Sequence, residues 1–467
     1  MAPKMIRLFR HSISTNAFIL ALLEFCLLTL FVYQNFETLL LAAEEHYFLI
    51  CIAFSFLIIL IFMSLGLYNQ DITTNRKIMA VRFLFAIGLL LIIAACINKI
   101  VFHMTSGMLY YPSWVLMIRV FIVGFFLFLV RMIYVQTIAM RFLRKILVIG
   151  AGKMAERLNE LFASPSMHGI KFVGFIGVKD ETVGMPAFMS IARDDFKLEK
   201  LAELFRQFRA EEIVFAPDDK RGISLEAFLH LKLKGYKIYD FQSFVEQEKG
   251  RIEVEHLNMS GFVFTDGFTF GFLHDAIKRV FDLVTACLLF VVTLPIIIIA
   301  IICIKIESRG AALFSQERVG FEGKLFQLYK LRSMNIDAEK KSGPKWAAEN
   351  DDRITRIGRI LRKTRIDELP QLWNVIKGDM SFVGPRPERP IFVSDLAKKI
   401  PYYQERHVVK PGITGWAQIN YPYGASLEDA KEKLCYDLYY AKNRSLFLDL
   451  TILLQTVRVI IWPTGVR

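Results

Sequence analysis

The sequence predicts a membrane protein of mixed class: a four-helix transmembrane bundle, a Rossmann-like α/β cytoplasmic domain, and a re-entrant membrane helix that leads into a mainly α-helical catalytic domain. Three observations predict this organisation. Hydrophobic residues make up 54% of the 467 residues, yet charged residues still make up 22%, so apolar and charged stretches must alternate. Four apolar runs precede residue 140, and a strand, a glycine loop and a helix pattern follow directly. We expect domains at 1–140, 141–266 and 267–467, in line with about 150 residues per domain.

The composition excludes a disordered chain, a collagen-like repeat and a small disulfide-stapled protein. The formal charge of +13 leaves three kinds of partner, namely nucleic acid, anionic lipid and phosphorylated substrates. The six cysteines and eight histidines show no metal-binding spacing. Any metal is therefore expected to have oxygen ligands.

Each of the four apolar runs is close to the ~20 residues that a helix needs to cross a bilayer. They are Ala17–Phe36, Tyr47–Tyr68, Val81–Phe102 and Trp114–Val135. The lysines and arginines around and between them number three, none, three, one and four, and the last set comprises Arg131, Arg141, Arg144 and Lys145. Positive charge collects on the cytoplasmic side of membrane proteins, so this alternation places the N-terminus and everything after residue 140 in the cytoplasm.

A fifth apolar run, Leu283–Ile304, is also long enough to cross a bilayer. Cations stand at both of its ends, so neither end favours the outside; they are Lys278, Arg279, Lys305, Arg309 and Arg318. Pro295 lies near its middle, where a proline lacks the N–H that a helix needs and so kinks or breaks it. We therefore expect a re-entrant helix that turns at Pro295 and returns to the cytoplasmic face, with a fifth span as the alternative.

The segment from Arg144 to Asp266 has an α/β pattern, with strands predicted at Lys145–Ile149, Lys171–Val178, Glu212–Ala216 and Lys237–Asp240. The first strand leads into Gly150-Ala-Gly152-Lys-Met-Ala155, a sequence whose glycines let a phosphate approach a helix N-terminus. The acid that binds ribose about 20 residues further on is missing, because Asp180 comes 28 residues after Gly152. We expect a degenerate nucleotide-binding fold with a regulatory or dimerising role rather than a working NAD site.

A run of cations ends on two adjacent acids in the last part of the chain. The cations are Arg353, Arg356, Arg359, Arg362, Lys363 and Arg365, and the acids are Asp367 and Glu368. Arginines at three-residue spacing lie along one side of a helix and can grip diphosphate oxygens by paired N–H bonds. A carboxylate among them has its charged form favoured, and it can bind Mg²⁺ or attack phosphorus. A basic face next to anionic lipid would explain some of these charges but not the acids that close the run.

Five motifs in order give a specific resemblance from about residue 274 to 467. They are Gln316-Glu-Arg-Val-Gly320, Tyr329-Lys-Leu-Arg-Ser-Met334, Leu361-Arg-Lys-Thr-Arg-Ile-Asp-Glu-Leu-Pro-Gln-Leu372, Gly378-Asp-Met-Ser-Phe-Val-Gly-Pro-Arg-Pro-Glu388 and Lys410-Pro-Gly-Ile-Thr-Gly-Trp-Ala-Gln418. This series resembles the bacterial sugar transferases, which are polyprenyl-phosphate sugar-1-phosphate transferases. The four spans and the nucleotide-like middle domain are similar to the large membrane form of that family.

The resemblance implies transfer of a sugar phosphate from a UDP-sugar to undecaprenyl phosphate at the inner membrane of a bacterium, with Mg²⁺ and release of UMP. Asp367 corresponds to the family's nucleophile, which attacks the β-phosphorus to give a covalent phosphosugar. Glu368 corresponds to its partner carboxylate, and both are the expected metal ligands.

The substrate-binding residues follow from the same resemblance. Arg362 matches an arginine that holds a phosphate, and Arg386 and Pro387 match an element that contacts the uridine nucleotide. Lys330 and Arg332 are expected to neutralise the diphosphate.

The resemblance also bears on the membrane-facing segments. Lys278, Arg279 and Asp282 match the segment that leads into the family's re-entrant helix, and Pro295 matches its break. The amphipathic stretch Leu446–Ile461 is expected to lie at the bilayer surface, with an ordinary packed terminal helix as the alternative.

The expected partners are thus a UDP-sugar, undecaprenyl phosphate and the lipid bilayer, with a second copy of the chain as a further candidate and no nucleic acid. Two other functions compete: a membrane-tethered nucleotide-sugar-modifying enzyme and a nucleotide sensor that uses the middle domain. A dehydratase would need a Tyr-x-x-x-Lys pair after the glycine loop, which this sequence lacks. A function as a nucleotide sensor would not explain the motifs after Phe314.

Overall fold

The computed structural model describes residues 5–8, 11–35, 47–68, 76–104, 113–134, 144–162, 170–179, 189–257, 267–268, 271–335, 353–422, 424 and 426–462. It divides into two compact units, Met1–Lys249 and Gly250–Arg467. The first residues of the second unit already belong to its core, because Ile252 and Val254 are buried there and the Ile252 N–H donates to the Cys435 carbonyl.

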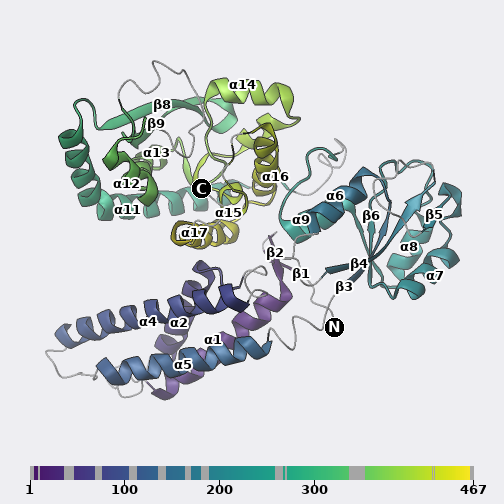
Figure 1. Ribbon diagram of the computed structural model, residues 1–467, viewed down its shortest axis with the longest axis horizontal. Coiled ribbons are helices and arrows are strands. Elements are labelled where there is room, and N and C mark those ends of the chain that lie inside the picture. The colour runs from purple at the N-terminus through teal and green to yellow at the C-terminus, as the bar shows by residue number, and fades with distance from the viewer. Residues whose placement is uncertain are drawn as a thin grey trace. The chain divides into compact units, whose positions relative to one another are not determined.

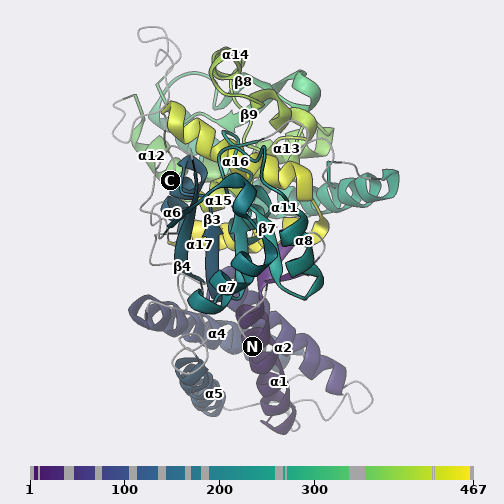
Figure 2. The same cartoon turned by 90° about the vertical axis from the view of Figure 1, so that its right-hand side faces the viewer.

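A short hairpin and four helices make up the described residues before position 140. The hairpin pairs β1 (Met5–Leu8) with β2 (His11–Ser14), and the helices are α1 (Thr15–Asn35), α2 (Tyr47–Ser64), α4 (Arg76–Met104) and α5 (Ser113–Tyr134). α1 packs on α2, and α4 packs on α5 (Figures 1 and 2). Among described residues, α1, α4 and α5 are each long and apolar enough to cross a membrane, and the apolar part of α2, Phe48–Ser64, is shorter.

The second helix ends earlier than the apolar run predicts. The run extends to Tyr68, but α2 ends at Ser64 because Gly66 takes a left-handed conformation with φ 72°. The Gly66 N–H donates to the Met63 carbonyl and the Leu67 N–H to the Phe62 carbonyl, which satisfies the helix end.

Arg131, counted above among the cytoplasmic flanking charges, lies inside the helix bundle. Its side chain is fully buried, its Nη2 lies 2.6 Å from Glu24 Oε2, and its Nη1 donates to the Leu67 carbonyl. The Tyr68 hydroxyl donates to the same carboxylate. A charge in this position is tolerated only with such a partner, so Arg131 joins α1 to α5 rather than marking the membrane surface. Three cations remain in the last segment, and the charge alternation is unchanged.

The middle of the chain forms a five-stranded parallel sheet in the order β5-β4-β3-β6-β7. The strands are β3 (Arg144–Ile149), β4 (Ile170–Val178), β5 (Met189–Ile191), β6 (Glu212–Phe215) and β7 (Lys237–Asp240). The first strand lies in the centre and the chain winds outward on both sides, as in Rossmann-type folds. The four predicted strands are confirmed to within a residue or so, and β5 was missed because three residues carry too little pattern.

Helices cover both faces of this sheet (Figure 1). α6 (Lys153–Phe162) and α9 (Phe241–Lys249) pack with the side chains of Ile146 and Val148 on one face. α7 (Leu198–Phe208) and α8 (Glu226–Leu233) pack with Leu147 and Ile149 on the other, and a 3-10 turn, η3 (Arg193–Asp195), precedes α7.

The glycine loop of this domain holds a carboxylate of the chain itself. The N–H groups of Lys153 and Met154, at the start of α6, donate to the Asp218 side chain at 2.9 and 2.8 Å. Asp218 follows β6 and lies so close that a Cβ at Gly152 would collide with its carboxylate. The position where a Rossmann fold receives a phosphate is therefore occupied by Asp218. The predicted loop Ser164-Pro-Ser166 and Asp180 lie outside the described residues.

The second unit is mainly helical with two small sheets. β8 (Leu313–Val319) pairs antiparallel with β9 (Leu325–Leu331), and β10 (Ser381–Val383) pairs parallel with β11 (Gly412–Thr414). Its helices are α11 (Phe272–Glu307), α12 (Arg356–Thr364), α13 (Gln371–Lys377), α14 (Pro390–Lys399), α15 (Trp416–Asn420), α16 (Leu427–Asn443) and α17 (Leu446–Ile461). Its described residues also include three 3-10 segments: η4 (Phe321–Gly323), η5 (Ile366–Glu368) and η6 (Tyr403–Val408).

α11 continues through Pro295 and bends, so that two arms run in different directions (Figure 1). The first arm holds α13 through Arg279, whose guanidinium donates to the carbonyls of Val375 and Ile376. The second arm buries Ile297, Ala300 and Ile304 against a cluster that includes β9 and α12. Both arms thus pack on the same unit. By length and composition alone, α11 also qualifies as a membrane-crossing helix.

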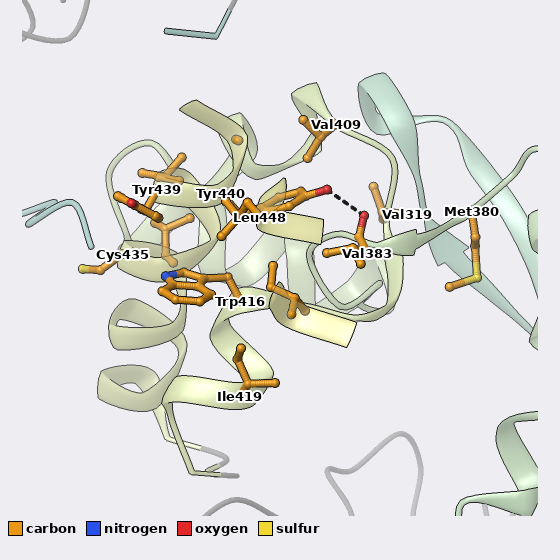
Figure 3. Packing of buried hydrophobic residues seen from close by; sticks show 14 of the residues in the cluster. Val319, Met380, Val383, Val409, Trp416, Ile419, Cys435, Tyr439, Tyr440 and Leu448 are labelled. Carbon is orange, nitrogen blue, oxygen red and sulfur yellow. Dashed lines mark hydrogen bonds between the residues drawn. The ribbon is translucent and has the colours of Figure 1, made fainter. Parts of the chain in front are cut away.

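A buried core holds β10, β11, α15 and α16 together (Figure 3). Trp416 stacks on Tyr439 with ring centroids 5.9 Å apart, and its Nε1 donates to the Gly250 carbonyl. The Tyr440 hydroxyl donates to the Val383 carbonyl at 2.9 Å, and it lies 2.8 Å from Asp449 Oδ1. These contacts fix the end of β10, from which the Arg386 loop departs.

Candidate active site

The Asp367–Glu368 pair lies on a sharp turn between two helices. α12 ends at Thr364, and Arg365 then takes a left-handed conformation with φ 59°. The chain continues through the 3-10 turn η5 and enters α13 at Gln371. This reversal turns Asp367 inward, so that only 6% of it is exposed.

One carboxylate oxygen of Asp367 is free to bind a ligand. Its Oδ1 is buried, and the described part of the chain gives that atom no hydrogen-bond partner. Burial and the neighbouring Glu368 raise the pKa of Asp367, whereas the charges of Lys330, Arg362 and Arg365 lower it, and the raising causes prevail. A buried acceptor left without a donor is costly, which favours a group that binds there.

Glu368 is instead held by cations. Its Oε1 accepts from Lys330 Nζ at 3.1 Å and from Arg386 Nη2 at 3.0 Å, and Arg365 Nη1 lies 3.8 Å away. Burial raises the pKa of Glu368, but the charges of Lys330, Arg386 and Arg365 outweigh it and hold that pKa well below the usual range. Burial, together with Arg386, lowers the pKa of Lys330. The two adjacent acids therefore differ: Glu368 is a paired carboxylate, whereas Asp367 forms no ion pair within the part of the chain that the structure describes.

The loop that carries Arg386 is fixed through four consecutive carbonyl groups. The Pro385 carbonyl accepts from the Gly412 N–H, and the Arg386 carbonyl accepts from Arg406 Nη2. The Pro387 carbonyl accepts from Arg318 Nη1, and the Glu388 carbonyl accepts from the Val319 N–H. Before them, the Gly384 N–H donates to the Thr414 carbonyl. The main chain of Arg386 is thus held in place, so its guanidinium is pre-positioned against Glu368.

A cavity of about 820 Å³ opens at this pair. Among the described residues that line it, ten are lysines or arginines and four are acids, so it suits a polyanion. Apolar side chains from α11, β8 and α17 also line it, including Leu289, Phe314 and Ile460. A phosphorylated ligand with a hydrocarbon tail fits both parts of this lining.

The structure brings most of the predicted site residues together. Lys330, Arg362, Arg365 and Arg386 line the cavity beside Asp367 and Glu368. Their binding roles stay predictions.

Two predicted substrate-binding residues have other contacts. The Arg332 guanidinium lines the cavity but donates to the carbonyls of Arg309 and Ser308 and to the Ser308 hydroxyl, and so braces the end of α11. Pro387 is buried outside the lining, and its carbonyl accepts from Arg318. For both residues these contacts favour a structural role.

Only half of the cation run from Arg353 to Arg365 lines the cavity. Arg353, Arg362 and Arg365 line the cavity. Arg356, Arg359 and Lys363 are exposed and are not among the lining residues. Ile357 and Leu361 pack into a hydrophobic cluster with α11, which turns those three cations outward.

Sequence reasoning missed a second buried group at the cavity. Arg406 and Asp437 are 6% and 2% exposed, and Arg406 Nη1 donates to the Tyr403 hydroxyl at 2.8 Å. Arg406 lies four residues before the Lys410-Pro-Gly motif, which could have drawn attention to it. Asp437 lies within a helix of mixed composition and gives no such signal.

The predicted lead-in residues of α11 are buried around one lysine. Lys278 Nζ lies 2.7 Å from Asp449 Oδ2 and 3.6 Å from Asp282 Oδ1. Asp282 Oδ1 also accepts from the N–H of Phe382, which lies in β10. α17, which carries Asp449, is therefore packed on one side while Leu450, Val457 and Ile460 are exposed on the other.

Among the described residues, the structure forms no cluster of three or more His, Cys, Asp or Glu side chains suited to a metal. The Asp367–Glu368 pair supplies two carboxylates. That number suits Mg²⁺, which commonly binds one or two protein carboxylates and completes its shell with water and substrate phosphates.

Comparison with known proteins gives consistent matches. A family model described as "Bacterial sugar transferase" matches residues 273–463. A UDP-N-acetylgalactosamine-undecaprenyl-phosphate N-acetylgalactosaminephosphotransferase of Aeromonas hydrophila is 39% identical over 253 residues, 54% of this chain and 58% of that protein.

Two further relatives are covered over more than two thirds of their length. A putative undecaprenyl-phosphate N-acetylgalactosaminyl 1-phosphate transferase of Bacillus subtilis (strain 168) is 56% identical over 131 residues, 28% of this chain and 73% of that protein. A UDP-glucose:undecaprenyl-phosphate glucose-1-phosphate transferase of Caulobacter vibrioides is 44% identical over 187 residues, 39% of this chain and 69% of that protein.

Proposed function

The chain belongs to the bacterial sugar transferase family, and on that premise we propose that it transfers a sugar 1-phosphate from a UDP-sugar to undecaprenyl phosphate. The products are UMP and the first lipid-diphosphate-linked sugar of a surface polysaccharide. The observation that carries the proposal is the buried, unpartnered Oδ1 of Asp367 beside the cation-held Glu368 in one cavity.

Asp367 is the nucleophile in this proposal. Its Oδ1 forms a bond to the β-phosphorus of the UDP-sugar while the bond from that phosphorus to the bridging oxygen breaks, and UMP leaves with the bonding electrons. The phosphate oxygen of undecaprenyl phosphate then attacks the same phosphorus, and Asp367 departs as a carboxylate. Two steps let UMP leave before the second polyanion enters.

Lys330, Arg362 and Arg386 offset the charge of the two phosphate groups. Glu368 holds Lys330 and Arg386 in place through its Oε1, so these cations are ordered before substrate binds. Asp367 and Glu368 would hold Mg²⁺, which commonly binds one or two protein carboxylates and completes its shell with water and substrate phosphates. When bound, the ion withdraws charge from the diphosphate and the leaving UMP.

The membrane arrangement follows from the acceptor. A polyprenyl chain stays in the bilayer, so the cavity must open at its surface. We infer that α11 enters the cytoplasmic leaflet, bends at Pro295 and returns, because both of its arms pack on the unit that carries the cavity. We infer that the catalytic unit lies on the cytoplasmic side of the bacterial inner membrane, and from the alternation of positive charge that the N-terminus lies there too.

N-acetylgalactosamine is our first candidate for the sugar. Two of the relatives above carry it in their names, including the one that is 56% identical. The alternative functions that use the middle domain lose support, because Asp218 occupies the phosphate position of the glycine loop.

The test is a single-turnover experiment on the purified full chain in detergent or nanodiscs. With Mg²⁺ and UDP-N-acetylgalactosamine labelled in the sugar, but without acceptor, the protein should release about one UMP per active site and acquire the label. The Asp367→Asn variant should fold, release no UMP and stay unlabelled. Full turnover with acceptor but no label without it would overturn the covalent step. Absence of UMP release with a panel of UDP-sugars and undecaprenyl phosphate would overturn the function.

A further inference from the structure

One asparagine of α13, Asn374, is fully buried and bonds to the edge of a strand. Its exposed fraction is 0%, and it is not among the described residues that line the cavity. Its side-chain Oδ1 accepts from the Tyr329 N–H at 3.1 Å, and its Nδ2 donates to the Gln327 carbonyl at 2.7 Å. Both main-chain groups lie on one edge of β9, so the side-chain amide makes the two bonds that a residue of a neighbouring strand would make.

The main chain of the same asparagine holds the turn that leads into β10. Its carbonyl accepts from the N–H groups of Gly378, Asp379 and Met380 at 3.1, 3.0 and 3.2 Å. Its Nδ2 also donates to Asp379 Oδ2 at 3.3 Å. β10 begins at the next residue after this turn and leads to Arg386. Asn374 therefore contacts two segments besides its own helix.

These two segments carry the cations that hold Glu368. Lys330 directly follows Tyr329 in β9, and Arg386 follows β10. Both donate to Glu368 Oε1, and Glu368 lies six residues before Asn374 on the turn that enters α13. One buried residue thus joins the segment of the acid to both segments that carry its cations.

From this arrangement we propose that Asn374 is a positioning residue, which fixes the spacing of Glu368, Lys330 and Arg386. It acts on turnover through these three groups and does not contact the substrate. A side chain without the amide would leave the two bonded groups of β9 without a partner, so the strand would move relative to the turn. Its effect on turnover rests on the proposed function, whereas its effect on the spacing does not.

An isosteric variant whose polarity depends on pH tests the effect on turnover. In Asn374→Asp, the ionised carboxylate has no donor and opposes the Gln327 carbonyl and the Asp379 carboxylate. Once protonated, the new group again has one donor and one acceptor, as the amide has. Burial and the charge of Asp379 raise its pKa. We expect kcat/KM to lie on the order of 10²-fold below wild type at about pH 8.5, and to recover at least about tenfold relative to wild type by about pH 6.

Asn443→Asp is the matched control. Asn443 is 1% exposed, and its Nδ2 donates to the Tyr439 carbonyl within α16 at 3.2 Å. This variant should lower the melting temperature, but its kcat/KM relative to wild type should stay constant with pH. A constant ratio for folded Asn374→Asp, or a recovery at low pH that Asn443→Asp shares, would overturn the proposal.

Hydrogen exchange gives a second readout that needs no substrate, and Asn374→Ser provides a variant without a new charge. In the full chain in nanodiscs, the Tyr329 N–H should exchange at least about tenfold faster than in the wild type. Exchange in the η5 turn should also rise, and exchange in α14 should not. Asn443→Ser should leave β9 and η5 unchanged. Unchanged exchange in β9 and η5 of Asn374→Ser would overturn the proposal even in an active enzyme. A wild-type chain that releases no UMP would instead overturn the proposed function, and faster exchange in β9 and η5 would still support the positioning role.

Discussion

The guanidinium of Arg406 lies 2.7 Å from the carboxylate of Asp437, and both side chains are buried. The same Nη2 donates to the main-chain carbonyl of Arg386 at 3.0 Å. Asp437 therefore holds Arg406, and Arg406 holds the loop that places Arg386 against Glu368. We therefore expect the pair to act on the proposed reaction by positioning Arg386.

We predict that Asp437→Asn lowers kcat more than it changes KM for the UDP-sugar. Displacement of a catalytic group by about 1 Å costs on the order of 10²-fold in rate, so the loss should approach that value. Removing the whole partner in Asp437→Ala leaves a buried charge and should cost about 3–5 kcal/mol of stability. Steady-state kinetics and thermal unfolding measure the two effects.

Asp395→Asn is the matched control, because Asp395 forms an exposed pair with Lys399. It should leave kcat unchanged and should change the free energy of unfolding by no more than about 0.5 kcal/mol. An Asp437→Asn enzyme with normal kcat would show that Arg386 does not depend on this pair.

A second prediction distinguishes Arg362 from Arg332, which the sequence analysis both expects to bind phosphate groups. Arg362→Ala should lower kcat/KM on the order of 10²-fold at unchanged thermal stability, because Arg362 lines the cavity beside Asp367. Arg332→Ala should instead destabilise the protein by about 1.5–3 kcal/mol, because it removes hydrogen bonds of a charged group to Ser308 and Arg309. Kinetics and unfolding of both variants decide the point. Loss of kcat/KM in a fully stable Arg332→Ala enzyme would restore its predicted role with the diphosphate.

The middle domain gives a third prediction. Asp218→Ala removes two charge-assisted hydrogen bonds from the start of α6 and should destabilise the first unit by about 1–3 kcal/mol. It should also free an anion position, so ADP or NAD should bind the variant more tightly than the wild-type chain. Calorimetric titration of the full chain with ADP or NAD measures the affinity of the variant and of the wild type. Tight binding of either nucleotide to the wild type would contradict the assignment of Asp218 as the occupant.

A fourth prediction concerns Glu24 and Arg131 inside the helix bundle. Glu24→Gln leaves Arg131 buried without a countercharge and should lower the melting temperature in detergent. Replacing both, with Glu24→Gln and Arg131→Met, should recover part of the loss, since no unpaired charge remains. A double variant that is less stable than either single variant would mean that the pair itself is strongly stabilising.

Patterning predicted the parts whose local signal is strong. The apolar runs located α1, α2, α4 and α5, the strand pattern located four of five strands, and the motifs located Asp367 and Glu368 next to Lys330 and Arg386.

The phase of the α12 helix was harder to predict, because the charges alone do not say which side faces the cavity. The apolar positions Ile357 and Leu361 carried that information, since they define the buried face and leave Arg359 outward.

Contacts between distant residues were beyond sequence reasoning. The burial of Arg131 depends on Glu24, 107 residues away, and the filling of the glycine loop depends on Asp218, 64 residues after Met154. No local pattern marks either partner, because each pairing exists only once the helices or strands are packed. Pro295 is the intermediate case: its kink was predicted, but the contacts that bring both arms of α11 onto one unit were not.

The last prediction tests whether α11 is re-entrant. In the re-entrant arrangement, Lys305 and Arg279 lie on the same, cytoplasmic side, whereas a straight helix of 36 residues, ~54 Å long, would place them on opposite sides. A Lys305→Cys variant should therefore react with a membrane-impermeant maleimide in inverted membrane vesicles and not in intact spheroplasts. Lys398→Cys, exposed on α14, is the matched reference and should give the same pattern. Pro295→Ala restores the missing N–H and removes the clash that bends the helix, so it should move the two arms apart and lower both stability and turnover. Labelling of Lys305→Cys in intact spheroplasts would contradict the re-entrant arrangement of α11.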